Sequence, residues 1–332
     1  MPISAELERA AESGEPEAQF ELAVELLSAT PPPPDDVRRG VELLEAAAAG
    51  GHAGAAERAA LLDAMGVVRP ASWDRCLDQL QAAAELGSVT AQCQLLLLAD
   101  SSSEPVPPTD PEPIFWAEVR RRVMIEQRLA AGERIVVSED PRIRLIKGFA
   151  TPAECGWLMA IARQRLRRAT VFDRATGEQI LDPVRDNSSV SLQLMQMDVV
   201  TEVIRNRIAA ATRLPVPLFE ETQILQYAVG QRFKAHHDFL DPANPAYHDE
   251  IQRFGQRIAT FLLYLNDGYE GGQTSFPKIK LSYAGETGAA LFFANVDRAG
   301  KPDEATLHAG LPPLSGEKWV LSQWIRDRSP AL

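Results

Sequence analysis

Residues 226–239 read QYAVGQRFKAHHDF, and the His-His-Asp triplet at 236–238 decides what the second half of the chain can be. In an extended strand, side chains two residues apart point to the same face. His236 and Asp238 therefore share a face from which both can hold one metal ion, while His237 points away.

A metal site of this kind needs one more ligand from elsewhere in the chain. The sequence has only five histidines: His52, His236, His237, His248 and His308. His308, in TLHAGLPPLSG, would complete a triad of two histidines and one carboxylate, which leaves three positions of an octahedral iron open. His-x-Asp alone is weak evidence, because a strand histidine is more often a hydrogen-bonded core residue. We expect His52 and His248 not to be ligands.

Short strand-like segments separated by turn residues follow Glu221: TQILQYAV (222–229), RFKAHHDF (232–239), RIATFLLYLN (257–266), GAALFFANV (288–296) and KWVLSQWIR (318–326). Two helices are predicted before them, one from a capping box at Thr151 to about Arg168 and one over 198–211. Helices followed by strands predict an α+β domain built on a double-stranded β-helix, or jelly roll, with flanking helices.

The N-terminal third contains a weak repeat. Gly14, Gly51 and Gly87 are spaced by 37 and 36 residues, and an alanine follows each of them four residues later. This period, filled with Ala and Leu at helical spacing, predicts an α-helical repeat solenoid of antiparallel helix pairs. The segments after Asp36 and Trp73 resemble the second helix of Sel1-like repeats, relatives of the tetratricopeptide class. Repeats of this kind usually bind partners, although an Ala-rich helical domain without a partner is the alternative.

A Ser/Pro-rich stretch, DSSSEPVPPTDPEP at 100–113, cannot form a regular helix or a central strand. We place the domain boundary here. The predicted division is repeats at 1–100, a linker and a connecting helix at 101–140, and the strand-rich domain at 141–330.

Charge is distributed unevenly along the chain. The net charge is -12, and residues 1–110 hold 19 acidic side chains against 6 arginines. The remainder is near neutral and offers no basic face to a nucleic acid. The acidic N-terminal part could attract a basic partner, although a solvated surface explains the charge equally well.

Targeting signals and cysteines bear on location. No apolar run reaches the roughly 18 residues that a membrane span needs, so we expect no membrane association. The N-terminus lacks the pattern of a secretory signal, and Cys76, Cys93 and Cys155 are odd in number and widely separated. We therefore expect a cytoplasmic protein with reduced thiols.

The wider sequence around the triplet resembles the prolyl 4-hydroxylase family of Fe(II)- and 2-oxoglutarate-dependent dioxygenases. The resemblance runs from about Pro141 to Arg328 and is carried by QYAVGQRFKAHHDF, RIATFLLYLND, GGQTSFP and the segment 290–326. It is looser at PAECGWLMAIA and at VRDNSS near Arg185. The first 140 residues lie outside it.

The resemblance implies a role for each matching position. The iron ligands, and with them the catalytic residues, would be His236, Asp238 and His308. The 2-oxoglutarate contacts would be Lys318, Tyr227, Thr274 and Trp324. Arg257, at the start of its strand, matches a position expected to bind the peptide substrate, although a strand-start arginine is often only a surface charge.

A cation is also required on chemical grounds, because the distal carboxylate of 2-oxoglutarate would be costly to bury unpaired. In the strand KWVLSQWIR, Lys318 shares one face with Val320, Ser322 and Trp324 by period-2 alternation. We expect that face to be the interior one.

The implied reaction is hydroxylation of a prolyl residue in a protein or peptide by O2, coupled to decarboxylation of 2-oxoglutarate to succinate, with ascorbate as a further cofactor that the family allows. Loops at 169–182 and 241–254 would be mobile and set specificity. The alternatives are an oxygenase of the same class acting on another side chain or a small molecule, and a repeat-based scaffold with an iron- or oxygen-sensing domain. Intact ligand positions argue against the scaffold.

Overall fold

A computed structural model of the chain describes residues 3–29, 32–100, 102–109, 111–112, 114–168, 170–172, 179–181 and 185–329. They form two compact units. The helical unit contains the residues up to 129 together with 193–205, and the sheet unit contains 130–192 and the residues from 206 onwards. The predicted boundaries at 100 and 140 stay predictions. No described helix is both long and apolar enough to cross a membrane.

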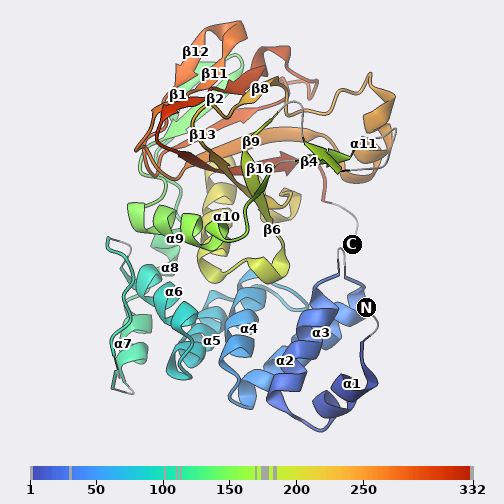
Figure 1. The fold of residues 1–332 in the computed structure, drawn as a ribbon, viewed down its shortest axis with the longest axis vertical. Coiled ribbons are helices and arrows are strands. Elements are labelled where there is room, and N and C mark those ends of the chain that lie inside the picture. Colours follow the sequence, from blue (N-terminus) through green and yellow to red (C-terminus); the bar gives the residue numbers. More distant parts are fainter. Residues whose placement is uncertain are drawn as a thin grey trace. The chain divides into compact units, whose positions relative to one another are not determined.

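The helical unit is a succession of antiparallel helix pairs (Figure 1). The helices are α1 (Ala5–Glu12), α2 (Pro16–Leu27), α3 (Pro34–Ala49), α4 (Ala53–Met65), α5 (Trp73–Glu85), α6 (Val89–Ala99), α7 (Phe115–Arg121) and α8 (Ile125–Leu129). The predicted repeat is therefore present. Where one connecting helix was predicted within 101–140, the structure has two short helices, α7 and α8, because the chain leaves the helical conformation between them.

The repeated small residues have distinct tasks. The backbone φ angles of Gly14, Gly51 and Gly87 are +90°, +91° and +90°, a region that disfavours any side chain with a Cβ, and each glycine lies two residues before the second helix of a pair. Ala18, Ala55 and Ala91 are buried. Small side chains at these positions let neighbouring helices approach closely.

Residues 193–205 also belong to the helical unit, although they lie far along the chain. They comprise a 3-10 turn, η1 (Leu194–Gln196), and the first half of α10 (Val199–Thr212). The Arg58 guanidinium donates to the carbonyl of Met197 at 2.7 Å, and the Gln94 side-chain oxygen accepts from the Val199 N–H at 2.9 Å.

The sheet unit contains two facing antiparallel sheets (Figure 1). The larger has the order β1-β2-β13-β9-β16-β7-β6-β3, formed by β1 (Ile135–Glu139), β2 (Arg142–Ile146), β13 (Ala290–Ala294), β9 (Arg257–Tyr264), β16 (Lys318–Arg326), β7 (Thr222–Tyr227), β6 (Ser188–Leu192) and β3 (Arg167–Arg168). The smaller has the order β12-β11-β14-β8, formed by β12 (Leu281–Tyr283), β11 (Thr274–Phe276), β14 (His308–Gly310) and β8 (Phe233–His236). Two short ribbons pair β10 (Glu270–Gly271) with β15 (Pro313–Ser315) and β4 (Thr170–Phe172) with β5 (Gln179–Leu181).

The core of this unit fills the space between the two sheets. The ring of Phe276, from the smaller sheet, meets that of Phe293, from the larger, edge to face at 5.1 Å between centroids. Ile143, Leu291 and Val320 belong to the same buried cluster. The predicted α+β class with a jelly-roll core is confirmed.

Helix α9 (Pro152–Arg163) packs on the outer face of the larger sheet, where Phe149, just before it, meets the Phe261 ring at 4.9 Å. The predicted capping box is present, because Thr151 and Glu154 exchange side-chain to backbone hydrogen bonds. The prediction that this helix extends to about Arg168 is wrong, since residues 167–168 form β3 and pair with β6.

The two predicted specificity loops differ in what can be said of them. Most of 169–182 lies outside the described residues. In 241–254, residues 248–254 form a helix, α11 (His248–Phe254), rather than an irregular loop. The side chain of Arg326 holds it by donating to Glu250 Oε1 at 2.6 Å and to the carbonyl of Gly255 at 2.7 Å.

Candidate active site

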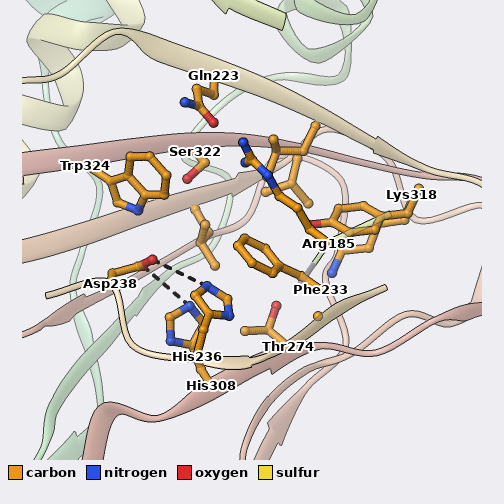
Figure 2. A pocket seen from close by; sticks show the side chains of 15 residues that line it. Arg185, Gln223, Phe233, His236, Asp238, Thr274, His308, Lys318, Ser322 and Trp324 are labelled. Atoms are coloured by element: carbon orange, nitrogen blue, oxygen red, sulfur yellow. Dashed lines mark ion pairs between the residues drawn. The ribbon is translucent and has the colours of Figure 1, made fainter. Parts of the chain in front are cut away.

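His236, Asp238 and His308 converge at one end of the smaller sheet (Figure 2). Strands β8 and β14 pair so that His236 and His308 are directly opposite each other. His236 Nε2 lies 3.4 Å from Asp238 Oδ1, and His308 Nε2 lies 3.4 Å from Asp238 Oδ2. The three ligand atoms all lie within 4.8 Å of one another, which is close enough to hold one ion.

The local backbone explains why these three side chains meet. β8 ends at His236, so Asp238 lies just beyond the strand and is 4% exposed. His237 turns away, as predicted, and its Nε2 lies 3.2 Å from the carbonyl oxygen of Glu304. The described groups of His, Cys, Asp and Glu contain this one candidate metal cluster.

Hydrogen bonds to the backbone fix the tautomer of both histidines. His236 Nδ1 lies 2.7 Å from the Lys234 carbonyl oxygen, and His308 Nδ1 lies 3.0 Å from that of Thr306. A carbonyl oxygen only accepts, so each Nδ1 carries the hydrogen and each Nε2 keeps its lone pair. Those lone pairs are what a metal ion would bind.

Electrostatics favour the protonation states that a metal requires. Burial lowers the pKa of His308 to about 4, so its imidazole is neutral near pH 7. Burial by itself would raise the pKa of Asp238, but the neighbouring His308 and His236 and the hydrogen bond from the Thr260 hydroxyl together hold it well below its usual range. An anionic carboxylate and a neutral imidazole are the ligand forms that bind metal.

The pocket beside this cluster has a volume of about 480 Å³ including its mouth. Lys318, Val320, Ser322 and Trp324 all line it, so the interior face predicted for β16 is the observed one. The predicted cosubstrate residues Tyr227 and Thr274 line it too, the first paired with Lys318 in the strand register. The Thr274 hydroxyl accepts from the Tyr264 hydroxyl at 2.8 Å.

Lys318 is the charged group at the end of the pocket. Its side chain is 2% exposed, and its ammonium donates to the Gly272 carbonyl at 2.7 Å and lies 5.5 Å from the ring centres of Tyr227 and Tyr264. No described carboxylate pairs with it. Burial therefore lowers its pKa to about 7. A buried cation with room beside it and no counter-charge is suited to an anionic ligand.

Arg257 does not line the pocket. Its guanidinium forms a two-point ion pair with Glu220, at 2.6 and 2.9 Å, and lies 3.8 Å from the ring centre of Trp324. Arg257, the predicted substrate residue, therefore lies behind Trp324, which was predicted to line the pocket and does. Its role in binding a peptide stays a prediction.

The sequence analysis did not identify several pocket residues. The Phe233 ring stacks on His236 with 3.6 Å between centroids, and Arg185 lies over Phe233 at 5.7 Å (Figure 2). Gln223 lies at the opposite end of the pocket from the metal cluster. The position of Phe233, three residues before His236 in the same segment, was the one available signal. Arg185 lay in the looser part of the family resemblance, at VRDNSS, without a predicted role, and for Gln223 the sequence offered no signal.

Thr260 is a further missed residue, and it contacts the cluster itself. Its hydroxyl donates to Asp238 Oδ2 at 2.7 Å. The cluster supplies two imidazole nitrogens and a carboxylate held by a buried donor, and a pocket adjoins it. This set of groups fits a divalent iron of the two-histidine, one-carboxylate type.

The class of protein follows from this fold and site together with a family comparison. Residues 222–326 match the model of the 2OG-Fe(II) oxygenase superfamily. Prolyl 4-hydroxylase 1 of Arabidopsis thaliana is 37% identical over 209 residues, a match that covers 58% of this chain and 72% of the relative. The chain belongs to the prolyl 4-hydroxylase family.

Solved structures with weaker overall similarity were also found. The viral collagen prolyl hydroxylase vCPH of Paramecium Bursaria Chlorella virus-1, in its 2OG complex, has a TM-score of 0.42 and 30% identity, covering 55% of this chain and 95% of that one. A Sel1 repeat protein from Oxalobacter formigenes has a TM-score of 0.28 and 24% identity, covering 37% of this chain and 36% of that one.

Proposed function

We propose that this protein hydroxylates a prolyl residue of a protein or peptide, using Fe(II), 2-oxoglutarate and O2. The observation that carries the proposal is a single pocket lined both by the His236, Asp238 and His308 cluster and by the buried Lys318. Family membership supports the reaction class. The name of the Arabidopsis relative supports proline as the target.

Each part of the pocket has a proposed task. His236, Asp238 and His308 would hold the iron, which when bound supplies the oxidising chemistry that 2-oxoglutarate and O2 drive. Lys318 would pair with the distal carboxylate of 2-oxoglutarate, which satisfies both buried charges at once. Tyr227 and Thr274 place hydroxyl groups beside that pair.

The substrate side of the pocket is proposed to be the end that carries Trp324. Trp324 lines the pocket and supports the flat guanidinium of Arg257. The Glu220 carboxylate accepts from Nε and one Nη along one edge of that guanidinium and so fixes its plane. An arginine held in this way could donate its remaining hydrogens to a peptide carbonyl.

The activity is tested with proline-containing peptides, Fe(II) and 2-oxoglutarate in air. We expect succinate to form and one oxygen atom to be added to a proline, located by fragment mass spectra. Asp238→Ala and peptides with alanine in place of proline are the controls. Addition of oxygen to another side chain would favour the alternative, an oxygenase of the same class with a different target. If no substrate gives succinate, the proposed oxygenase activity is wrong.

Substrate recruitment by the helical unit is a second part of the proposal. The unit is acidic, and Glu21 and Glu25 lie exposed on one side of α2. A basic protein substrate would be attracted to such a surface. Charge reversal of both residues should raise the KM for a basic protein substrate and leave the KM for a short peptide unchanged. Equal KM changes for both substrates would reject recruitment.

We also propose a cytoplasmic location, which the three free thiols support. A fluorescently tagged full-length chain that fractionates elsewhere would overturn it.

A further inference from the structure

We propose that Thr260 and Asn295 form a buried relay that positions Asp238 for metal binding, an inference that rests on the proposed iron site. Neither residue belongs to the predicted ligand set. Both would act as positioning residues, because they reach the metal position only through Asp238.

The relay is built by the larger sheet. Thr260 lies in β9 opposite Phe293 of β13, and Asn295 directly follows that strand. The Asn295 side-chain nitrogen donates to Thr260 Oγ1 at 3.0 Å, and Thr260 Oγ1 donates to Asp238 Oδ2 at 2.7 Å. Thr260 is 1% exposed and Asn295 0% exposed, so water does not compete for these bonds.

The order of donors gives the relay a direction. An amide nitrogen can only donate, so it occupies a lone pair of the Thr260 hydroxyl oxygen. The hydroxyl hydrogen is then committed to Asp238 Oδ2. Asn295 thereby keeps Thr260 from turning its hydrogen elsewhere.

Asp238 needs such a restraint more than the two histidines do. The backbone carbonyls of Lys234 and Thr306 already hold His236 and His308. Among the described residues, Thr260 is the one donor outside the cluster that reaches the Asp238 carboxylate. Because Thr260 occupies one lone pair of Oδ2, Oδ1 would keep both of its own for the metal.

The Asn295 side-chain oxygen supports a functional reading of the relay. It is buried and has no hydrogen-bond partner among the residues that the structure describes. An unsatisfied buried carbonyl is destabilising, and an apolar side chain of similar size would avoid that cost. Asn295 therefore lowers the stability of the fold while its amide nitrogen donates to Thr260. Such a residue is expected where the donated hydrogen bond is needed at the metal site.

The test uses the full-length chain and Mn(II) as a redox-inert probe of the iron site, titrated without 2-oxoglutarate. Thr260→Val keeps the shape and removes the donor, so the Mn(II) dissociation constant should rise by about 10- to 100-fold. Thr260→Ser keeps the hydroxyl and should restore most of the affinity. Unchanged affinity in Thr260→Val would overturn the relay.

Asn295→Leu tests the direction of the relay. It should weaken Mn(II) binding in the wild-type background and have little further effect in Thr260→Val, because its action passes through the hydroxyl. Additive losses in the double variant would show that Asn295 acts by another route, and the relay would be rejected.

Two further measurements separate this inference from its alternatives. If Thr260 were only structural, Thr260→Val would lower the unfolding temperature of the metal-free chain without changing the Mn(II) dissociation constant. Asp238→Ala separates the inference from the proposed function. If it binds Mn(II) as well as the wild type, the iron site itself is wrong. If it loses binding while Thr260→Val does not, only the relay fails.

Discussion

Lys318 is an ionisable side chain that is almost fully buried, and its burial predicts how the binding of 2-oxoglutarate depends on pH. Burial lowers its pKa from 10.5 to about 7, so above pH 7 the ligand-free protein holds a neutral lysine. A carboxylate placed beside the amine favours the charged form and raises its pKa again. Binding at pH 8.5 should therefore take up roughly one proton, and binding at pH 6 none.

Calorimetry in buffers of different ionisation enthalpy measures this uptake on the Mn(II)-loaded chain. Lys318→Met should bind 2-oxoglutarate about 10- to 100-fold more weakly and lose the uptake. The exposed Lys147, paired with Glu286, supplies the control Lys147→Met, which should behave as the wild type. Proton uptake that persists in Lys318→Met would show that another group titrates.

The same pKa shift also predicts the stability of the ligand-free chain. The unfolded lysine keeps its ordinary pKa of 10.5, so above pH 7 the unfolded state binds more protons than the folded one. Stability should therefore rise with pH from 7 until the cysteines of the unfolded chain ionise. Urea unfolding at pH 7 and 8.5 measures the difference, which should shrink in Lys318→Met. An equal rise in both proteins contradicts the assignment.

The residues that could be predicted from the sequence are those with a pattern of their own. His236 and Asp238 stand two apart in a strand-like segment, and Lys318 begins a strand whose alternation shows its inner face. Thr260 and Asn295 have no such pattern, because a threonine in a strand looks like an ordinary β-branched residue. Their connection to Asp238 exists only once β9 and β13 pair.

Helix α9 depends on a buried ion pair, which yields a prediction for a whole element. Both oxygens of Glu154 accept from the Arg207 guanidinium, at 2.9 and 3.0 Å, and one also accepts from the Thr151 N–H at 2.9 Å. Glu154→Gln leaves the arginine buried without its counter-charge and should cost about 3–5 kcal/mol of the free energy of unfolding. Denaturant unfolding measures this loss.

Two controls show whether burial is the cause. Glu286→Gln breaks an exposed pair in the same unit and should cost less than about 1 kcal/mol. Replacing both Glu154 and Arg207 by apolar residues should recover much of the stability lost in Glu154→Gln. A loss in Glu154→Gln no larger than in Glu286→Gln would contradict the account.

The bounds of a helix could be predicted where neighbouring residues determine them. They could not be predicted where a contact with a residue far away in the sequence determines them. The start of α9 was predictable from Thr151, Pro152 and Glu154. Its end was not, because residues 167–168 leave the helix to pair with β6. Helix α11 was expected to be a loop, since its link to Arg326 joins positions more than 70 residues apart.

For the chain as a whole, the segment 193–205 matters most, because it lies between strands of the sheet unit in sequence yet belongs to the helical unit. Leu194 and Met195 pack against the apolar cluster that contains Leu44 and Leu62. Sequence alone could not show this, since the segment reads as part of an ordinary amphipathic helix. The two units are therefore linked by more than one crossing of the chain.

A chain that begins at Ala130 should consequently be unstable, although it keeps every residue of the proposed active site. Deletion removes Arg58 and Gln94, the partners of Met197 and Val199, and leaves the segment's buried apolar side chains without the helices that cover them. Those that pack against the removed helices are Leu194 and Met195, which contact the cluster that contains Leu44 and Leu62. At up to about 1.5–3 kcal/mol each, their exposure should lower the unfolding temperature by about 5 °C or more. Adding residues 1–129 as a separate chain should restore part of the loss in a thermal scan, and a truncated chain that unfolds at the full-length temperature would show that the helical unit does not support this segment.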